Sequence, residues 1–425
     1  PAPAAGTQAY VGARILPIAG PEIPDGVLIV RDGKIVAVGP RASTPVPDGA
    51  QVRDVAGKVL MPGLVDTHSH VGGGSGGDAS GALQPEARIL DALNVRDSGL
   101  QRAQAGGITT VNVMPGSGHL LSGQTLYLKL RDDARTVDDL TIRNTDGSLA
   151  FGVKMANGTN SIRPGGGAFP GTRAKSAAMA RALFLRAQEY RDKVKAAGSD
   201  KTKLPARDLG LEIMVEVLDG KRVVHHHTHR HDDIVTVLRL AKEFGFRVVL
   251  QHVSEGWKVA DEIARAGVPC SVIVIDSPGG KLEAIDMRLE TGATLSKAGA
   301  LVGFHTDDYI TDSRLFLRSA ALAVRAGMDR QKALEAMTLA GAKMLDLQDR
   351  IGTLEAGKDA DFILLSGDPL SVYAQVLETY VEGRKVFDRA DPKDRLIATG
   401  GYGATRDQVA HLDCFGDDHG HGGGK

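Results

Sequence analysis

Two histidines one residue apart, His68 and His70, end the stretch VLMPGLVDTHSH at residues 59–70. The apolar residues before them favour a β-strand, in which successive side chains alternate between the two faces. His68 and His70 would therefore point to the same side, where two neutral imidazoles can bind one metal ion together. A polar pair that ends an apolar strand indicates a site at the carboxyl edge of a sheet.

Further polar side chains fall at the ends of other predicted strands. They are Lys154, His227, His252 and Asp307, which belong to or follow strands expected at 150–155, 222–227, 247–252 and 300–306. The carboxyl ends of parallel strands in a βα barrel form one face, where barrel enzymes build their active sites. Imidazoles, a carboxylate and a lysine on one rim predict a divalent-metal site. Nitrogen and oxygen ligands without thiolates favour zinc, with iron, manganese or nickel as alternatives.

The elements that must position these residues alternate between apolar strands and helical stretches, the pattern of parallel βα units. Besides the strands just named, we expect strands at 64–68, 109–114, 140–143 and 268–275, and helices at 86–105, 175–197 and 208–218. Eight strands within residues 62–343 fit the size of an α/β fold of the (β/α)8 TIM-barrel type with loop insertions.

The sequence on either side of this barrel has a different pattern. Residues 1–61 and 344–390 read as short β segments with turns, and we expect them to form one small β-sandwich domain from both ends of the chain. Residues 391–425 are rich in Gly, Asp and His, including His411, His419 and His421, and we expect a flexible tail.

Composition excludes several classes of protein. The 425 residues are 42% hydrophobic and 24% charged, with a net charge of -1, which favours neither a nucleic-acid nor a membrane partner. No apolar run approaches the roughly 18 residues that span a bilayer. The two cysteines, Cys270 and Cys414, match no metal-ligand spacing. The sequence opens with PAPAAG and no Met, which suggests a mature or trimmed form. We therefore expect a periplasmic or secreted location, with the cytoplasm as the alternative.

Five stretches together resemble the amidohydrolase superfamily of metal-dependent hydrolases, in particular its imidazolonepropionase-related and Xaa-Pro dipeptidase-like branch. They are PGLVDTHSH at 62–70, VHHHTHRHDDI at 224–234, VVLQHVSEG at 248–256, GFHTDD at 303–308 and RIGTLEAGKDADFILL at 350–365. The resemblance covers nearly the whole chain except the tail. It implies that the metal ligands are His68, His70, His227, His252 and Asp307.

Lys154, in FGVKMANG, sits where two-metal members of the superfamily place a lysine carboxylated by carbon dioxide. The resemblance therefore implies two divalent ions bridged by carboxylated Lys154. In the run His225-His226-His227-Thr228-His229, strand alternation puts residues 225, 227 and 229 on one face. The resemblance selects His227 as ligand and leaves His229 to contact the substrate. The alternative is that His229, the next residue on that face, is the ligand instead of His227.

Other residues are candidates for substrate binding. The glycine-rich loop MPGSGHLLSGQT at 114–125 carries His119 but lacks the ending of a phosphate-binding loop. It is either a lid or a substrate contact. Arginines able to bind a carboxylate with two hydrogen bonds are Arg143, Arg163, Arg173 and Arg230, with a solvated surface role as the alternative for each.

The reaction we expect is hydrolysis of an amide bond, most simply in a dipeptide or an N-acyl amino acid, by water activated on the metal. Asp307 would accept the proton of the water and return it to the leaving nitrogen, and His229 would help to stabilise the oxyanion. The alternatives are hydrolysis of a cyclic amide, as in imidazolonepropionase, deamination, or a barrel kept only for binding. A homo-oligomer is compatible with the sequence.

Overall fold

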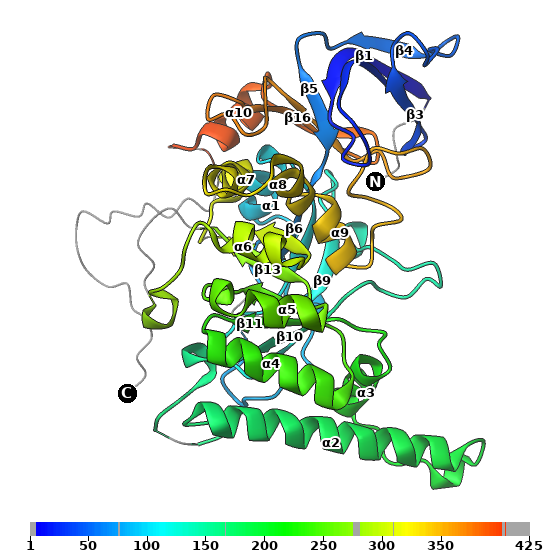
Figure 1. Cartoon of the computed structure of the whole chain (residues 1–425). Helices are drawn as coiled ribbons and strands as arrows, with labels where there is room; N and C mark the ends of the chain where they lie inside the picture. The colour runs from blue at the N-terminus through cyan, green and yellow to red at the C-terminus, as the bar shows by residue number, and fades with distance from the viewer. Residues whose placement is uncertain are drawn as a thin grey trace.

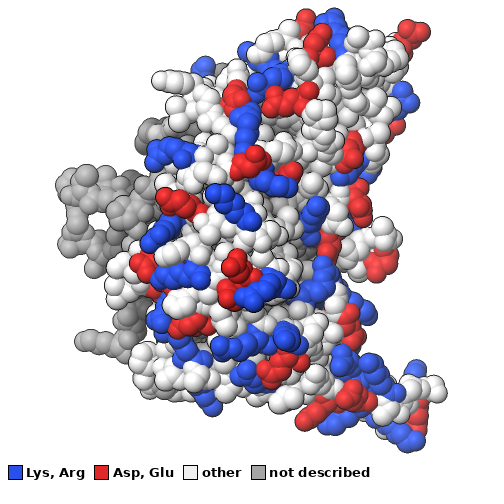
Figure 2. Space-filling model, viewed as in Figure 1, with Lys and Arg blue, Asp and Glu red and all other residues white. Residues whose placement is uncertain are grey.

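The computed structural model describes residues 6–74, 77–165, 167–274, 281–308, 310–401 and 404. Figure 1 shows an outer sheet at one end of the molecule and, below it, a group of strands surrounded by helices. The mixed α/β character predicted from the sequence is confirmed. Basic and acidic side chains alternate over the face drawn in Figure 2.

The inner strands follow one another around a ring. They are β6 (Leu64–Ser69), β7 (Ile108–Val113), β8 (Leu121–Gln124), β9 (Leu126–Lys129), β10 (Val153–Ala156), β11 (Val224–Thr228), β12 (Val248–His252), β13 (Cys270–Ile273) and β14 (Val302–His305). Hydrogen bonds join them in the orders β6-β7-β9 and β8-β10-β11-β12-β13-β14. One residue separates β8 from β9, and β14 lies beside β6. Seven of the eight strands expected here overlap an observed strand.

The prediction of a third strand at 140–143 is wrong. The place between β7 and β10 is taken by β9 and β8, which run antiparallel to these neighbours. Residues 140–143 form only isolated bridges, such as the one between Arg143 and Leu149. β8 has the sequence LSGQ and lies inside the stretch that we read as a glycine-rich loop. Glycine and small polar residues have a low strand propensity, so tertiary pairing rather than local sequence makes this strand.

Helices cover the outside of the ring. They are α1 (Ser98–Ala105), α2 (Arg173–Ala197), α3 (Leu209–Leu218), α4 (His231–Phe244), α5 (Ala260–Ala266), α6 (Thr291–Ala298), α7 (Phe316–Arg325), α8 (Arg330–Ala336) and α9 (Leu339–Met344). α10 (Pro392–Thr399) instead packs on α1 at the side of the outer sheet. α2 is the long helix at the foot of Figure 1 and packs on α3 and α4. Among the described residues, no helix is long and apolar enough to cross a membrane.

Local signals fix the ends of the helices that flank the histidine-rich strand. The side chain of Asp208 begins α3 by accepting a hydrogen bond from the N–H of Leu211 (2.9 Å). α4 ends at Gly245, whose φ of 74° is left-handed. α4 begins at His231, only two residues after His229. This short connection holds the carboxyl end of β11 against the helix.

The outer sheet is built from both ends of the chain. Its strands are β1 (Thr7–Ile15), β2 (Ile23–Arg31), β3 (Lys34–Pro40), β4 (Gln51–Asp54), β5 (Val59–Pro62), β15 (Phe362–Leu365), β16 (Val376–Val381) and β17 (Arg384–Asp388). They pair in the order β17-β16-β15-β5-β1-β2-β3, with β4 on β1. Tyr10, Phe362 and Tyr380 pack ring to ring in its core. β5 leads through Gly63 directly into β6, so the sheet and the ring are joined at the residues before His68.

Two expectations about helices need correction. The helix expected at 86–105 is limited to α1, because residues 86–97 form turns and a short 3-10 helix around Ile89. The tail expected to be flexible from residue 391 contains α10, which begins at Asp391 with its side chain accepting from the N–H of Lys393 (2.8 Å). The tail residues His411, Cys414, His419 and His421 lie outside the described residues.

Candidate metal centre

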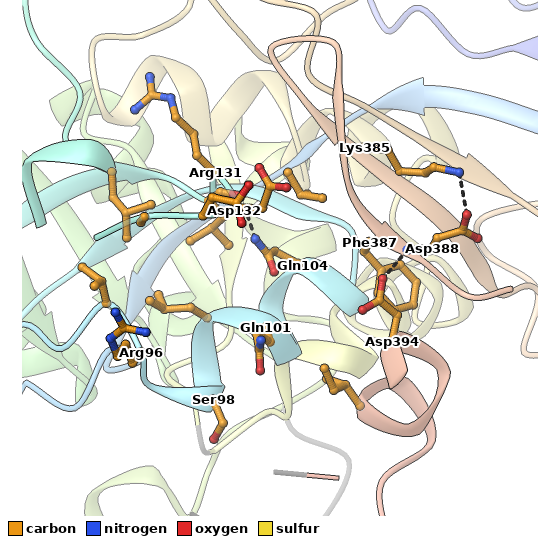
Figure 3. Close-up of a pocket in the computed structure, with 18 of the residues that line it drawn as sticks. Arg96, Ser98, Gln101, Gln104, Arg131, Asp132, Lys385, Phe387, Asp388 and Asp394 are labelled. Atoms are coloured by element: carbon orange, nitrogen blue, oxygen red, sulfur yellow. Dashed lines mark hydrogen bonds and ion pairs between the residues drawn. The ribbon is translucent and has the colours of Figure 1, made fainter. Parts of the chain in front are cut away.

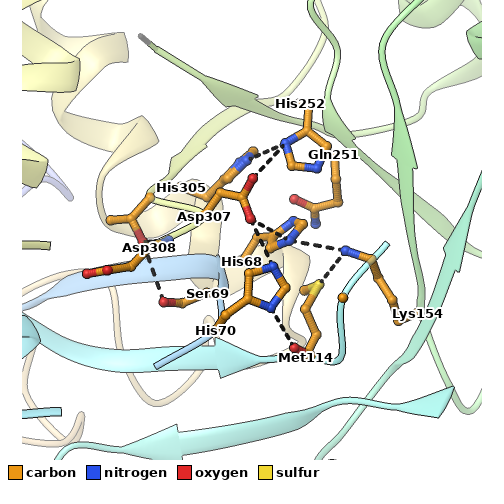
Figure 4. Close-up of polar contacts among 12 residues, drawn as sticks. His68, Ser69, His70, Met114, Lys154, Gln251, His252, His305, Asp307 and Asp308 are labelled. Carbon is orange, nitrogen blue, oxygen red and sulfur yellow. Dashed lines mark hydrogen bonds and ion pairs between the residues drawn. The ribbon is translucent and has the colours of Figure 1, made fainter. Parts of the chain in front are cut away.

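The carboxyl ends of β6 and β14 bring the first ligand candidates together (Figure 4). Asp307 Oδ1 lies 2.9 Å from His70 Nε2 and 3.3 Å from His68 Nε2. The N–H of Asp307 donates to the carbonyl of His68 (2.9 Å), and Asp66 accepts from the N–H of Thr306 (3.1 Å). These bonds lock β14 to β6, so the distance between the two histidines and Asp307 is set by the main chain.

The contacts of His70 suggest that a proton or a metal ion lies between its ring and Asp307. His70 Nδ1 lies 2.8 Å from the carbonyl of Met114, and since a carbonyl only accepts, Nδ1 must carry the proton. The other ring nitrogen, Nε2, faces the carboxylate oxygen of Asp307, 2.9 Å away. Two acceptors at this distance repel each other unless a proton or a metal ion binds between them. The donor set therefore fits a divalent ion held by His68, His70 and Asp307.

A second group faces the first. His227, His229 and His252 offer ring nitrogens within 4.8 Å of one another. Their rings pack closely, with centroids 4.5 Å apart for His227 and His252 and 4.9 Å apart for His229 and His252. Both ring nitrogens of His227, and Nε2 of His229 and His252, are buried without a hydrogen-bond partner. Unpaired buried nitrogens are costly, and a metal ion would bind them.

Strand alternation places the histidines of β11 as the sequence predicted. His225, His227 and His229 face the interior, while His226 lies among residues of α2 and α4 on the outside. The fold does not force a choice between His227 and His229 as metal ligand, because ring nitrogens of both residues lie close enough to bind one ion together with His252. His229 differs in one respect: its Nδ1 is bonded to Ser254 Oγ (2.7 Å).

Lys154 is fully buried beside His68. Its Nζ lies 3.1 Å from His68 Nε2 and 3.1 Å from Met114 Sδ, and no carboxylate of the described residues pairs with it. Burial lowers the pKa of Lys154 to about 7, although the charge of Asp307 opposes this shift. An ammonium without an anionic partner is unfavourable at this position.

The electrostatics of the other groups follow from burial. Burial lowers the pKa values of His68, His227 and His252 well below the usual range, and neighbouring positive charges add to the shift. The imidazoles are therefore neutral, the form that binds metal. Burial alone would raise the pKa of Asp307, but the hydrogen bond and charge of His70 hold that pKa below its usual value.

Two site residues have unusual backbone conformations. His252 has a φ of 71° and Asp307 a φ of 50°, in the left-handed region that side chains other than glycine seldom adopt. Val253, which is β-branched, follows at 53°. Such conformations cost of the order of 1–3 kcal/mol each and are kept where the surrounding structure forces them. Here they turn His252 and Asp307 toward the same point at the ends of β12 and β14.

His305 joins the centre without having been predicted. Its Nε2 lies 3.1 Å from His252 Nδ1, its ring stacks on His68 at 4.9 Å, and it is fully buried. The signal was available, since His305 lies two residues before Asp307 and strand alternation places residues two apart on one face. Asp308, by contrast, turns away and accepts a hydrogen bond from the N–H of Ser313 (3.0 Å).

The residues predicted to bind substrate lie outside this cluster. His119 packs on Phe169, and Arg163 braces the same loops through the carbonyls of Gly118 and Asn160. Arg230 pairs with Asp232 at the exposed start of α4. Arg173 pairs with Asp233 (2.8 Å). In the described part of the chain, none of these four side chains hydrogen-bonds to the ligand candidates.

Arg143 requires a correction. Its strand partner Leu149 accepts a hydrogen bond from Arg222, which precedes β11. Arg143 therefore lies at the amino end of the ring strands, opposite to the histidines, and its side chain bonds to Gly147 and Asp138. The error follows from the misplaced third strand, because the end of that strand was taken as part of the rim.

A cation that the sequence did not single out acts on the centre. Lys281 begins the short 3-10 helix Leu282–Ala284, and its charge lowers the pKa values of His227 and His229. Asp307 in turn acts on Lys281, whose pKa is lowered by burial. No pattern in the sequence marks this lysine as part of the centre.

One cavity of the described residues lies away from the centre. It has a volume of about 1100 Å³ and lies between α1, β17 and α10 (Figure 3). Its polar lining includes Arg96, Gln101, Asp132 and Asp394, and no histidine. Its size alone therefore gives no reason to place chemistry there.

Comparisons with known proteins agree with this geometry. The Amidohydrolase family model matches residues 59–387. A solved amidohydrolase from Thermotoga maritima MSB8 has 33% sequence identity and a TM-score of 0.83, covering 90% of this chain and all of that one. The chain belongs to the amidohydrolase family, and it is an enzyme of that family.

Three curated relatives are more distant. The chain is 28% identical to amidohydrolase tasK of Hapsidospora irregularis over 85% of its own length, but spans only 40% of that protein. It is 24% identical to a 5-methylthioadenosine/S-adenosylhomocysteine deaminase of Symbiobacterium thermophilum, covering 89% of this chain and 92% of the relative. It is also 24% identical to an imidazolonepropionase of Sphingopyxis alaskensis, and the match covers 87% of this chain and 94% of the relative.

Proposed function

We propose that the chain is a metal-dependent hydrolase that cleaves the amide C–N bond of a dipeptide or an N-acyl amino acid. The observation that carries this proposal is the meeting of two ligand groups, His68, His70 and Asp307 on one side and His227, His229 and His252 on the other. The proposal includes two divalent ions, with zinc favoured by the nitrogen and oxygen donors. It takes residues 62–343 as a (β/α)8 barrel, with 1–61 and 344–390 as the flanking domain.

Lys154 would bridge the two ions as a carboxylated lysine. Its buried amine has His68 and Met114 as neighbours, and no carboxylate among the described residues pairs with it. Carboxylation converts a cation that is unfavourable among metal ions into an anion with two oxygens. Its position on β10, between the strands that carry the two groups, supports this role.

A bound divalent ion would lower the pKa of its water from 15.7 to about 7 and supply the nucleophile near neutral pH. Asp307, held as a carboxylate, accepts the proton as the water oxygen attacks the carbonyl carbon. The C–N bond then breaks as Asp307 returns that proton to the leaving nitrogen. His229 Nε2, buried and unpaired, is placed to stabilise the oxyanion or to bind metal.

Lys281 is a further candidate, beside Arg163, Arg173 and Arg230, for binding a substrate carboxylate. Its charge lowers the pKa values of His227 and His229, and the charge of Asp307 acts on Lys281 in turn. A dipeptide or N-acyl amino acid carries a carboxylate near the scissile amide, which an ammonium at the rim can pair with. We expect Lys281→Ala to raise KM for these substrates with a smaller change in kcat. Esterified or amidated analogues should not distinguish Lys281→Ala from the wild type.

A metal analysis and a substrate panel test the proposal together. We expect about two zinc ions per chain, an extra mass of 44 Da on Lys154 under native conditions, and hydrolysis of some members of a panel of dipeptides and N-acyl amino acids. A ratio near one ion per chain, or full activity of Lys154→Ala, would contradict the bridged pair.

A second candidate is hydrolysis of a cyclic amide or deamination, favoured by the relatives named imidazolonepropionase and deaminase. Release of ammonia from an amino-substituted heterocycle, without hydrolysis of any acyclic amide, would select it. The metal centre would serve both reactions, and the groups around the substrate would differ.

A further inference from the structure

We propose that His305, Ser271 and Thr67 form a hydrogen-bond relay that fixes the proton of His252 on Nδ1 and leaves Nε2 free to bind metal. The inference rests on the proposed metal-dependent function. It assigns a positioning role to residues outside the ligand set that the sequence predicted.

The relay consists of fully buried side chains from neighbouring strands. His252 Nδ1 lies 3.1 Å from His305 Nε2. His305 Nδ1 lies 2.7 Å from Ser271 Oγ, and Ser271 Oγ lies 2.5 Å from Thr67 Oγ1. Thr67 Oγ1 in turn lies 3.5 Å from the main-chain carbonyl of Phe304. Figure 4 shows the first of these contacts, with dashed lines from the His252 ring to His305 and to Asp307.

The final carbonyl sets the direction of every bond. A carbonyl oxygen only accepts, so the Thr67 hydroxyl donates to Phe304. Thr67 Oγ1 then accepts from Ser271, and Ser271 Oγ accepts from His305 Nδ1. A neutral imidazole has one donor and one acceptor, so His305 Nε2 accepts from His252 Nδ1. His252 therefore keeps its lone pair on Nε2.

Two independent features of the centre agree with this direction. His252 Nε2 is buried and has no protein partner, which is expected of an atom that binds a metal ion. His252 Nδ1 also lies 3.8 Å from Asp307 Oδ2, a second acceptor that favours the proton on Nδ1. The reverse direction would place the proton on Nε2, inside the group formed with His227 and His229.

The partner of a metal-binding histidine usually fixes its tautomer, and loss of that partner lowers metal affinity about 10–100-fold. In most sites this partner is a carboxylate, a carbonyl or water. Here it is a second imidazole, which must itself be oriented, and Ser271 and Thr67 provide that orientation. The relay thus links His252 to Ser271 on β13 and to Thr67 on β6, the strand that also carries His68.

The test measures Zn²⁺ affinity of the full chain by competition with a chelator. We expect His305→Phe, which keeps the ring volume but has no nitrogen, to lower the affinity of one zinc position 10–100-fold. His305→Gln offers Oε1 as an acceptor to His252 and should restore most of that loss. Ser271→Ala should lower the affinity less, and Ser319→Ala, a buried serine away from the centre, should not change it.

A second readout reports the tautomer directly. In the wild-type apoprotein, ¹⁵N spectra of labelled histidines should show His252 protonated at Nδ1, and Ser271→Ala should make this signal a mixture. Ser271→Ala removes one hydroxyl only, so it keeps the inference testable if His305→Phe does not fold.

Three results would overturn the relay. Unchanged zinc affinity in both His305→Phe and Ser271→Ala would exclude it. Loss of a whole zinc equivalent in both His305→Phe and His305→Gln, with no effect of Ser271→Ala, would make His305 a direct ligand. A wild-type His252 protonated at Nε2 would reverse the direction. Absence of zinc binding by the wild type would instead refute the proposed function.

Discussion

Two clusters of ionisable side chains differ in whether their buried polar atoms are paired. The histidine cluster at the carboxyl ends of the ring strands comprises His68, His70, Lys154, His227, His229, His252, His305 and Asp307. The lysine cluster lies where β9 meets the outer sheet and comprises Lys34, Lys129, Arg131, Arg350, Asp359, Asp361 and Glu382. Lys129, 1% exposed, contacts Asp359 (2.5 Å) and Asp361 (2.7 Å), and Arg131 pairs with Glu382 (2.8 Å).

The comparison shows how a structural cluster can be separated from a functional one. Opposite charges in the lysine cluster compensate one another, so it needs nothing from outside the chain. The histidine cluster contains several nitrogens without partners and a lysine without an anion. A protein keeps such groups buried when a ligand supplies what is missing. Loss of a residue should therefore affect stability in the lysine cluster and ligand binding in the histidine cluster.

The largest expected effect is on catalysis. Asp307→Asn keeps the shape of the side chain but cannot accept a proton, so we expect kcat to fall about 10²–10⁴-fold. Zinc content should be measured in the same preparation. Asp308→Asn is the matched control, because Asp308 bonds to Ser313 away from the cluster. Equal activities of the two variants would remove Asp307 from the reaction.

Lys129→Met should give the largest loss of stability. It leaves the carboxylates of Asp359 and Asp361 without their buried cation, and we expect the free energy of unfolding to fall by about 3–5 kcal/mol in a urea titration. Lys34→Met is the control, because Lys34 also pairs with Asp359 but is 52% exposed, and should cost about 0–1 kcal/mol. Zinc binding should survive in both. A loss of zinc in Lys129→Met would mean that the two clusters are coupled.

Loss of one of the two proposed zinc ions should have a smaller effect on stability. At a free zinc concentration 100 times Kd, each bound ion stabilises the native state by about 2.7 kcal/mol. We expect this increment in the wild type and in Lys34→Met, and a reduced one in His227→Gln. The apoprotein of His227→Gln should be about as stable as the wild-type apoprotein, since neither ring nitrogen of His227 has a partner. A large loss in that apoprotein would give His227 a structural role.

The smallest expected effect is on the stability of the protein at low pH. Burial would raise the pKa of Asp359, but the charge and hydrogen bond of Lys129 hold it below its usual value. Unfolding restores a pKa of about 3.9, so the stability due to Asp359 is present above about pH 4 and is lost as the pH falls below it. The difference in unfolding free energy between wild type and Asp359→Asn should shrink over this range. A difference that stays constant between pH 6 and 3 would contradict the assignment.

Many residues of the metal centre could be predicted from their positions at the ends of strands. His68 and His70, His252 and Asp307 were predicted because each ends or follows an apolar strand, and a strand's two-residue period fixes which side chains share a face. The same rule predicts the interior position of His227 and the outward position of His226. The third strand was misread because β8 and β9 form by pairing with β7 and β10, not by local preference.

The sequence by itself determined the ligand candidates and the succession of strands, because alternation and apolar runs are local properties of the chain. Only the tertiary structure decided what each candidate meets. It turned Arg143 to the opposite end of the ring, brought Lys281 to the histidines, and set His305 between His252 and Ser271. Those neighbours come from segments distant in sequence. Their contacts depend on how strands and loops pack, which no local pattern encodes.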